Sequence, residues 1–191
     1  MATIQGAKYS SNGYFEIVYE GETHPRVGMM SISTIGTPNV IICGPVGVGK
    51  SHLITAFVVE IMKRYLIHVK FIGSAKLLHE IRATYSAEKE YDAEELMDEY
   101  SKAPILVIDD LGVEKPSDWV RETLYLIVDN RYNALLPTYI TSNRSPKQLA
   151  AKLDDRLVSR LLQGAIVLKL EGEDRRLIAP THTTEVIKSN G

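Results

Sequence analysis

Short apolar runs, rich in β-branched and aliphatic residues, recur along the chain and are separated by segments with helical periodicity. Most of these runs are apolar throughout, as expected of strands that are covered on both faces of a sheet. The intervening segments 53–61 and 120–128 place their apolar residues on one face of a helix. The pattern predicts five strands, at residues 39–43, 68–72, 105–109, 138–142 and 165–170.

The order of these elements favours one architecture. Strands that alternate with helices form parallel sheets, so we predict an α/β fold of three layers, α/β/α, with a five-stranded parallel sheet in the middle. Ser74, Ser117 and Ser145 precede predicted helices and suit the N-cap, and Pro146 suits a first helical position. The carboxyl ends of all five strands should then lie at one edge of the sheet.

Both ends of the chain depart from this pattern. Residues 14–20 resemble a strand, Gly21 a turn and residues 27–35 a second strand, so the start of the chain is expected to form a small β appendage. About twenty residues follow the fifth predicted strand, too few for a helical lid of several elements. We therefore expect an appendage at residues 1–38, a core at 39–175 and a tail at 176–191.

The first predicted strand leads into Gly-Pro-Val-Gly-Val-Gly-Lys-Ser, which fits the phosphate-binding pattern GxxxxGK[ST] and precedes a helix-like stretch. Its glycines let successive backbone N–H groups point at phosphate oxygens. Lys50 adds a charge, the helix that it opens adds a partial one, and the Ser51 hydroxyl suits Mg²⁺. The predicted nucleotide-binding residues are Gly44, Pro45, Val46, Gly47, Val48, Gly49, Lys50, Ser51 and His52.

Two further predicted strands end in polar side chains. Asp109 is predicted to hold Mg²⁺ through its water shell, and Asp110 to orient or deprotonate an attacking water. Asn143, after the next strand, is predicted to hydrogen-bond the γ-phosphate or that water. Taken alone, the acidic strand end and the Asn before Arg-Ser-Pro are also compatible with simple turns. The phosphate loop upstream favours a hydrolytic site.

Arg156 and Arg160 lie four residues apart, hence on one face of a predicted helix. If exposed, either could enter the nucleotide site of a neighbouring subunit, where an arginine finger neutralises charge that develops on the γ-phosphoryl group. Arg131 is a weaker candidate for the same role. The alternative is that Asp155 and Arg156 pair with local charges on a solvated helix, and the sequence leaves both open.

Composition narrows the setting. The chain of 191 residues has a formal net charge of −2, but segment 86–101 holds seven acids and one base, which leaves +4 for the remainder, where an anionic partner could bind. Within it, the run from Glu88 to Glu99 is predicted to be a helix with one apolar face, which either is simply solvated or offers a surface to a basic partner or an adjacent subunit. The single cysteine, Cys43, excludes an internal disulfide. No apolar stretch approaches the roughly 20 residues of a membrane span, so we expect a soluble, cytoplasmic protein without a membrane partner.

Taken in order, these motifs resemble those of the helicase-loader and transposition-helper ATPases of the DnaC, DnaI and IstB group within the AAA+ superfamily. The resemblance covers about residues 40–170 and depends on the stretches 44–53, 108–112, 114–119, 137–146 and 156–162. It implies that the cofactors are ATP and Mg²⁺, that Ser51 and Asp109 serve the metal, and that Asn143 is the first sensor. It also implies that Arg160 faces a neighbour's nucleotide, with Arg156 as the other contender.

The resemblance implies an ATP-hydrolysing AAA+ core with a reduced lid, acting in DNA replication as a helicase-loader-like oligomer with a replicative helicase and single-stranded DNA as partners. An IstB-like transposition helper, with a transposase as partner, is one alternative, and a nucleotide-gated adaptor with little turnover is another. Loaders of this group usually carry an N-terminal helicase-binding domain, whereas the region before residue 39 is short and strand-like here. Lys76 and Arg82 are candidate DNA contacts, and Arg175 and Arg176 candidate neighbours of the nucleotide.

Overall fold

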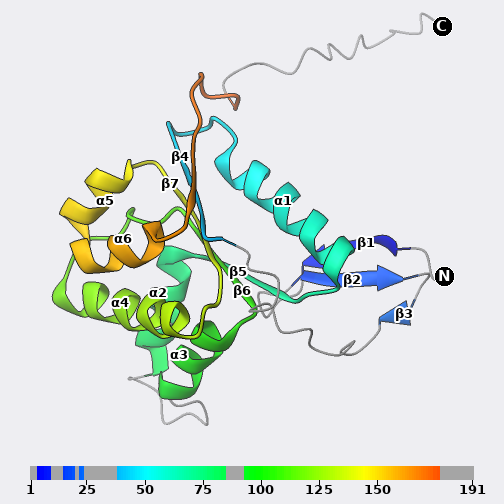
Figure 1. Cartoon of the computed structure of the whole chain (residues 1–191), viewed down its shortest axis with the longest axis horizontal. Coiled ribbons are helices and arrows are strands. Elements are labelled where there is room, and N and C mark those ends of the chain that lie inside the picture. The colour runs from blue at the N-terminus through cyan, green and yellow to red at the C-terminus, as the bar shows by residue number, and fades with distance from the viewer. Residues whose placement is uncertain (1–3, 10–14, 20–21, 24–37, 85–92, 177–191) are drawn as a thin grey trace, which may run out of the picture.

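A parallel sheet of five strands runs through the centre of the protein (Figure 1). The computed structural model describes residues 4–9, 15–19, 22–23, 38–84 and 93–176. The strands stand in the order β5-β6-β7-β4-β8, and every neighbouring pair is parallel. Their bounds are β4 Val40–Cys43, β5 Val69–Gly73, β6 Ile105–Asp109, β7 Thr138–Ser142 and β8 Ile166–Lys169. The predicted α/β fold and its five strands are confirmed, and each observed strand boundary lies within one residue of the predicted one.

Helices cover both faces of this sheet. Helix α1 lies on one face, whereas α2, α4, α5 and α6 lie on the other, which gives the three predicted layers (Figure 1). Among the described residues, no helix is long and apolar enough to cross a membrane. The bounds are α1 Lys50–Tyr65, α2 Ser74–Thr84, α3 Ala93–Lys102, α4 Asp118–Asn133, α5 Pro146–Lys152 and α6 Asp155–Leu162.

The sheet divides the hydrophobic core into two halves. Ile41 and Ile108 belong to the half beneath α2 and α4–α6, whereas their chain neighbours Ile42 and Val107 belong to the half beneath α1. Successive side chains of a strand point to opposite faces, so a strand that is covered on both sides is apolar at every position. This explains the uninterrupted apolar runs in the sequence.

The predicted helix caps are present with one exception. The Ser117 side chain accepts a hydrogen bond from the backbone of Val120 at the start of α4, and Ser145 forms a capping box with Gln148 ahead of Pro146 in α5. The prediction that Ser74 is an N-cap is wrong. Ser74 is the first residue of α2, which follows β5 directly, and its hydroxyl donates instead to the neighbouring strand end.

A small antiparallel meander precedes the core. It consists of β1 Ile4–Tyr9, β2 Phe15–Tyr19 and β3 Glu22–Thr23, and β2 lies close to β5 (Figure 1). The predicted strand at 14–20 is confirmed as β2, whereas β1, with its mixed composition, was not predicted; the strand predicted at 27–35 lies outside the described residues. The acidic helix predicted at 88–99 is confirmed from residue 93 onward, in α3, which buries Tyr100 in the core; its first residues lie outside the described part of the chain.

Candidate functional site

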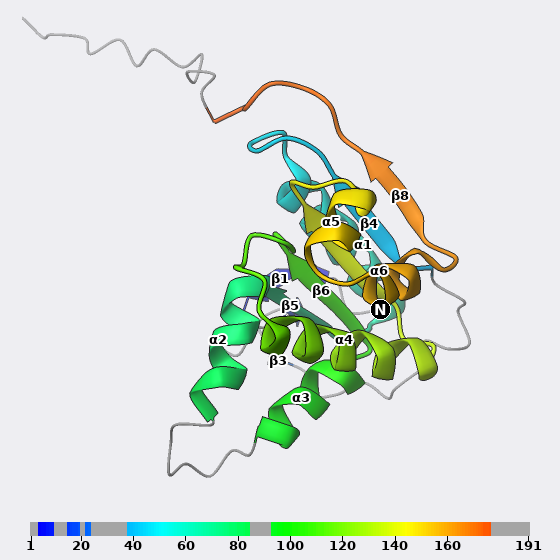
Figure 2. The same cartoon turned by 90° about the vertical axis from the view of Figure 1, so that its left-hand side faces the viewer.

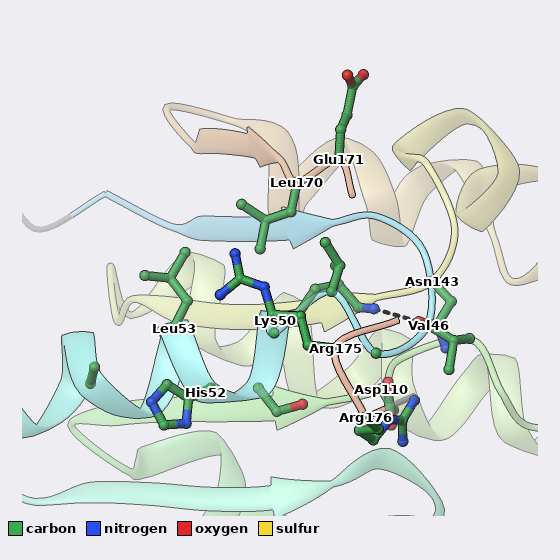
Figure 3. Close-up of a pocket in the computed structure, with 15 residues that line it drawn as sticks. Val46, Lys50, His52, Leu53, Asp110, Asn143, Leu170, Glu171, Arg175 and Arg176 are labelled. Atoms are coloured by element: carbon green, nitrogen blue, oxygen red, sulfur yellow. Dashed lines mark hydrogen bonds between the residues drawn. The ribbon is translucent and has the colours of Figure 1, made fainter. Parts of the chain in front are cut away.

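A cavity of about 810 Å³ lies at the carboxyl end of β4 (Figure 3). Residues 46–53 form one wall, and Asp110 and Asn143 line it from the ends of β6 and β7. The remaining wall comes from the segment after β8, including Leu170 and Arg175. Three strand ends that are far apart in sequence therefore meet at one hollow, as the predicted parallel sheet requires.

The phosphate loop turns into α1 at Gly49, whose φ of 102° is a left-handed conformation that glycine adopts without strain. The next residue, Lys50, is 5% exposed. Its ammonium group donates hydrogen bonds to the carbonyl oxygen of Pro45 at 2.7 Å and to Asn143 Oδ1 at 2.5 Å (Figure 3). The lysine therefore closes the loop beneath it and joins the loop to the end of β7.

The charge on Lys50 is only partly compensated by its surroundings. Burial lowers the pKa of its ammonium group, which Asp110 and Asp109 raise and Arg176 lowers, and the net direction is downward. Burial of a cation without full compensation favours the neutral form. A polyphosphate in the cavity would oppose this effect, because an anion close to the ammonium group stabilises its charged form.

Two residues at the start of the loop contribute to its shape more than to the cavity wall. A Cβ atom on Gly44 would lie 2.3 Å from the carbonyl oxygen of Leu170, so only glycine lets the end of β8 approach here. Pro45 supplies the carbonyl that Lys50 binds. Of the predicted nucleotide-binding residues, Val46 to His52 line the cavity.

The acidic pair at the end of β6 is held by hydroxyl groups from neighbouring elements. Thr141 Oγ1 donates to Asp109 Oδ1 at 2.5 Å and accepts from the backbone N–H of Asp110 at 2.9 Å. Ser74 Oγ donates to the carbonyl oxygen of Asp110 at 2.9 Å. Asp110 itself has a φ of 55°, a strained conformation for a residue other than glycine, and these bonds hold it there.

Thr141 and Ser74 are functional positions that the sequence analysis missed. The signal was present for Thr141, because the run Tyr-Ile-Thr-Ser-Asn places two hydroxyls in an otherwise apolar strand, and both prove to be fully buried. Buried hydroxyls need partners, so their presence indicates a hydrogen-bonded neighbour on the next strand. The prediction for this strand end named Asn143 and not Thr141.

The donor set suits Mg²⁺. Ser51 lines the cavity, whereas Asp109, the last residue of β6, is not among the described lining residues but is near enough to Lys50 that its charge opposes the lowering of the Lys50 pKa by burial. Mg²⁺ prefers oxygen ligands and commonly takes one or two from protein, with the rest from water and substrate phosphates. A hydroxyl and a carboxylate beside a phosphate loop therefore fit this ion.

The segment after β8 turns back across the phosphate loop. The backbone N–H of Arg175 donates to the carbonyl oxygen of Gly47 at 3.1 Å, and Arg176 pairs with Asp174 at 3.1 Å. Both arginines line the cavity, in agreement with their predicted position near the nucleotide. A Cβ atom on Gly47 would lie 1.6 Å from Asp174 Oδ1, so the segment packs directly on the loop.

The three candidate finger arginines have different surroundings. Arg160 pairs with Asp129 and is 27% exposed, whereas Arg156 pairs with Asp154 at 3.3 Å and is 72% exposed. The local pairing considered for Arg156 is thus present, but with Asp154 and not Asp155. Neither Arg156 nor Arg160 is among the described residues that line the cavity.

The prediction that Arg131 could reach a neighbouring subunit is wrong, because its side chain is completely buried. Its guanidinium group donates to Thr138 Oγ1 and to four backbone carbonyl oxygens, two of them at 2.6 and 2.7 Å. Burial lowers its pKa to about 9, so the side chain remains charged at neutral pH. Arg131 joins the ends of α3, α4 and β7.

Comparison with known proteins agrees with this geometry. A family model described as IstB-like ATP binding protein matches residues 28–182. The chain belongs to this family. It is 28% identical over 147 residues to the replicative helicase loader DnaI of Bacillus subtilis (strain 168), covering 70% of this chain and 46% of that protein. It is 29% identical over 145 residues to an ATP-binding protein of insertion sequence IS5376 from Geobacillus stearothermophilus, covering 73% and 55%.

The fold of this IstB-like protein also matches solved structures. The crystal structure of the DnaC helicase loader superposes with a TM-score of 0.63 at 30% identity, covering 71% of this chain and 79% of that one. The resemblance to the AAA+ group of DnaC, DnaI and IstB and its P-loop fold are therefore confirmed. The chain spans about half the length of the curated relatives named above.

Proposed function

We propose that this IstB-like protein hydrolyses ATP in a Mg²⁺-dependent reaction and acts as an ATP-dependent oligomer that loads a replicative helicase onto single-stranded DNA. The observation that carries the proposal is the 2.5 Å hydrogen bond from Lys50 to Asn143 across the cavity that Asp110 also lines. A site that only holds a triphosphate needs the loop and its lysine. Hydrolysis also needs groups that position a water for attack, and Asp110 after β6 and Asn143 after β7 suit this role.

The residues divide the work as follows. The loop N–H groups and Lys50 hold the phosphates, and Ser51 and Asp109 hold Mg²⁺, which when bound neutralises charge on the phosphate oxygens. Lys50 has three N–H donors, of which the described residues take two, so one is available to a phosphate oxygen. Asp110 and Asn143 orient the water, and the apolar end of the cavity around Leu53 suits the base (Figure 3).

The position of Arg156 and Arg160 supports the proposal that the protein acts as an oligomer. A loose, charge-rich transition state for phosphoryl transfer is stabilised by an arginine finger. Arg156 and Arg160 lie on α6 and are not among the described residues that line the cavity of their own chain, which supports a role at the nucleotide of a neighbour. ATP would then favour assembly, and hydrolysis would favour release, because the two nucleotides differ in the contacts that they offer across the interface.

A surface of α2 and of the loop before α4 supports binding to DNA. It contains a hollow of about 470 Å³ lined in part by His79, Arg82 and Lys115. The Arg82 guanidinium lies 4.4 Å from the ring centre of Trp119, and Lys76 is 55% exposed nearby on α2. Basic side chains contact phosphates, and aromatic and guanidinium planes stack on unpaired bases, so single-stranded nucleic acid suits this surface.

The proposal is tested by measuring phosphate release and molecular mass with ATP, with ADP and without nucleotide, each with and without single-stranded DNA. We expect Mg²⁺-dependent turnover, an ATP-dependent rise in mass, and loss of turnover in Lys50→Ala and Asp110→Ala. A protein that stays monomeric in ATP with DNA present would refute it. Turnover unchanged in Asp110→Ala, combined with partner binding lost in Lys50→Ala, would identify a nucleotide-gated adaptor instead.

The relative from an insertion sequence favours a second candidate, a transposition helper, which would use the same nucleotide chemistry. The two differ in partner and in DNA. Preference for single-stranded over duplex DNA, with capture of purified helicase, supports the loader. Preference for duplex DNA, with capture of a purified transposase instead of the helicase, supports the helper.

A further inference from the structure

A cluster of aromatic and charged side chains lies where α4 and α6 pack side by side (Figure 2). It comprises Tyr125, Asp129 and Tyr132 of α4 and Arg156 and Arg160 of α6, and is called here the α4–α6 cluster. Both guanidinium groups lie over the Tyr125 ring, Arg156 at 5.0 Å and Arg160 at 4.8 Å from its centre. The two arginines are nevertheless held in different ways.

The Arg160 side chain is fixed on several sides. Its Nε donates to Asp129, one terminal nitrogen donates to the carbonyl oxygen of Arg156 at 3.4 Å, and its guanidinium lies 5.7 Å from the ring centre of Tyr132 as well as over Tyr125. An arginine has five N–H donors, so within the described part of the chain three stay available. These belong to the terminal fork, the part of the side chain that binds phosphate in a bidentate manner.

Within the described residues, the Arg156 side chain is held by Asp154, two residues earlier at the start of the same helix, and by the ring of Tyr125. Its side chain is 72% exposed, against 27% for Arg160. An exposed ion pair of this kind restricts a long side chain little. The difference in tethering distinguishes two arginines that are equivalent in the sequence pattern.

The backbone beneath Arg160 is also tied to the nucleotide site. Asn39 Nδ2 donates to the carbonyl oxygens of Leu161 at 3.1 Å and of Arg160 at 3.4 Å, and Asn39 Oδ1 accepts from the N–H of Thr138 at 2.8 Å. Asn39 immediately precedes β4, and Thr138 begins β7. The end of α6 is thus joined to the two strands that lead to the phosphate loop and to Asn143.

We propose that Asp129 is a positioning residue, which holds the Nε edge of Arg160 so that its terminal fork is free to face the nucleotide of a neighbouring copy. This inference rests on the proposed function. The carboxylate does not quench the finger, because arginine stays protonated beside it and keeps its fork free. Asp129 limits the rotamers of Arg160 before a neighbouring subunit binds. Such preorganisation accelerates phosphoryl transfer, which depends on the exact position of the charged groups.

The first test compares Asp129→Asn with wild-type protein in steady-state ATP hydrolysis. Asn keeps the size of the side chain but removes its charge, so Arg160 is released from one edge. We expect kcat to fall about 10-fold or more with ATP binding changed by less than about twofold, because the loss concerns the transition state only. Asp129→Glu should recover part of kcat. Asp98→Asn, which removes an exposed ion pair with Lys102 on α3, is the matched control and should retain kcat.

The second test mixes variants. Asp129→Asn keeps a complete phosphate loop but offers a poorly placed finger, whereas Lys50→Ala lacks the loop lysine but offers an intact finger. Some interfaces of a mixed oligomer join an intact phosphate loop to an intact finger, so turnover should rise above that of either variant alone. The same rise is expected when Arg160→Ala is mixed with Lys50→Ala. Simple loss of folding, checked by thermal melting of each variant, gives no such rise.

Other outcomes would overturn the inference. If Arg160→Ala loses turnover but Asp129→Asn keeps it, Asp129 does not position the finger, although the proposed ATPase stands. Arg156 is the finger if Asp154→Asn loses turnover and recovers it on mixing with Lys50→Ala, while Asp129→Asn keeps the turnover of the wild-type protein. If wild-type protein shows no turnover in any assembly state, the proposed function itself fails and this inference with it.

Discussion

Replacement of Tyr139 by Phe should stabilise the protein. Tyr139 lies in β7 with its side chain completely buried beneath α1, and its ring centre is 5.6 Å from that of Phe57. Within the described part of the chain its hydroxyl has no hydrogen-bond partner. A buried polar group without a partner has lost its hydrogen bonds to water and gained none in return, whereas Phe keeps the packing and removes the cost.

The magnitude can be worked at two pH values. At pH 7 the unpaired hydroxyl costs about 1 kcal/mol, which Tyr139→Phe recovers. Burial raises the pKa of this hydroxyl from 10.0 to about 12. Between these values the unfolded chain loses a proton that the native protein keeps, so the wild-type free energy of unfolding falls as the pH rises. At pH 10.5 this amounts to about 0.8 kcal/mol, and the advantage of the variant grows to about 1.8 kcal/mol.

The assay is urea unfolding of both proteins at pH 7 and pH 10.5. Every other titrating group is shared, including Arg131, so the difference between the two proteins isolates the hydroxyl. Tyr65→Phe is the control, because Tyr65 is 39% exposed and its substitution should change stability by less than about 0.5 kcal/mol. A variant less stable than wild type at pH 7, or an advantage that is the same at both pH values, would refute the reasoning.

Three further predictions concern the fold and the site. Arg131→Lys leaves at most three donors for the five hydrogen bonds of the guanidinium, so it should lower the free energy of unfolding by about 3 kcal/mol in urea unfolding; reduced turnover with unchanged stability would contradict this. Gly44→Ala pushes a methyl group into the Leu170 carbonyl and should lower stability by about 1 to 3 kcal/mol in the same assay; an unchanged midpoint would show that the end of β8 moves freely. Asn143→Ala removes an acceptor of Lys50 and should lower kcat by about 10-fold or more, with ATP affinity within about threefold in nucleotide titrations; weakened affinity with intact kcat would place Asn143 in binding only.

The core strands could be predicted because each is covered on both faces. The run from Ile105 to Asp109 is apolar until its last residue, and such a run between helical segments is typical of a central parallel strand. β1 lacks this property, since Lys8 and Gln5 interrupt its apolar pattern. Its pairing with β2 depends on contacts across the meander, which a local pattern does not contain.

The candidate site was predictable where one residue type at one spacing requires one geometry. The loop from Gly44 to Ser51 is such a case. The acidic end of β6, at Asp109 and Asp110, is another, because it follows the loop in the same parallel sheet. Thr141 and Ser74 are different, because a hydroxyl has many possible partners and only the register of β7 against β6 brings Thr141 to the acidic pair. Long-range pairing decides those contacts.

The arginines show the same limit most clearly. Arg131, Arg156 and Arg160 all lie on helices and each follows a polar residue. Nevertheless, Arg131 is buried, Arg156 is exposed, and Arg160 is partly exposed and paired with Asp129. What separates them is the packing of α4 against β7 on one side and against α6 on the other. Arg131 faces the sheet and meets carbonyl groups, whereas Asp129, two residues earlier, faces α6 and meets Arg160. A single helix thus contacts the start of β7 through Arg131 and holds Arg160 of α6 through Asp129.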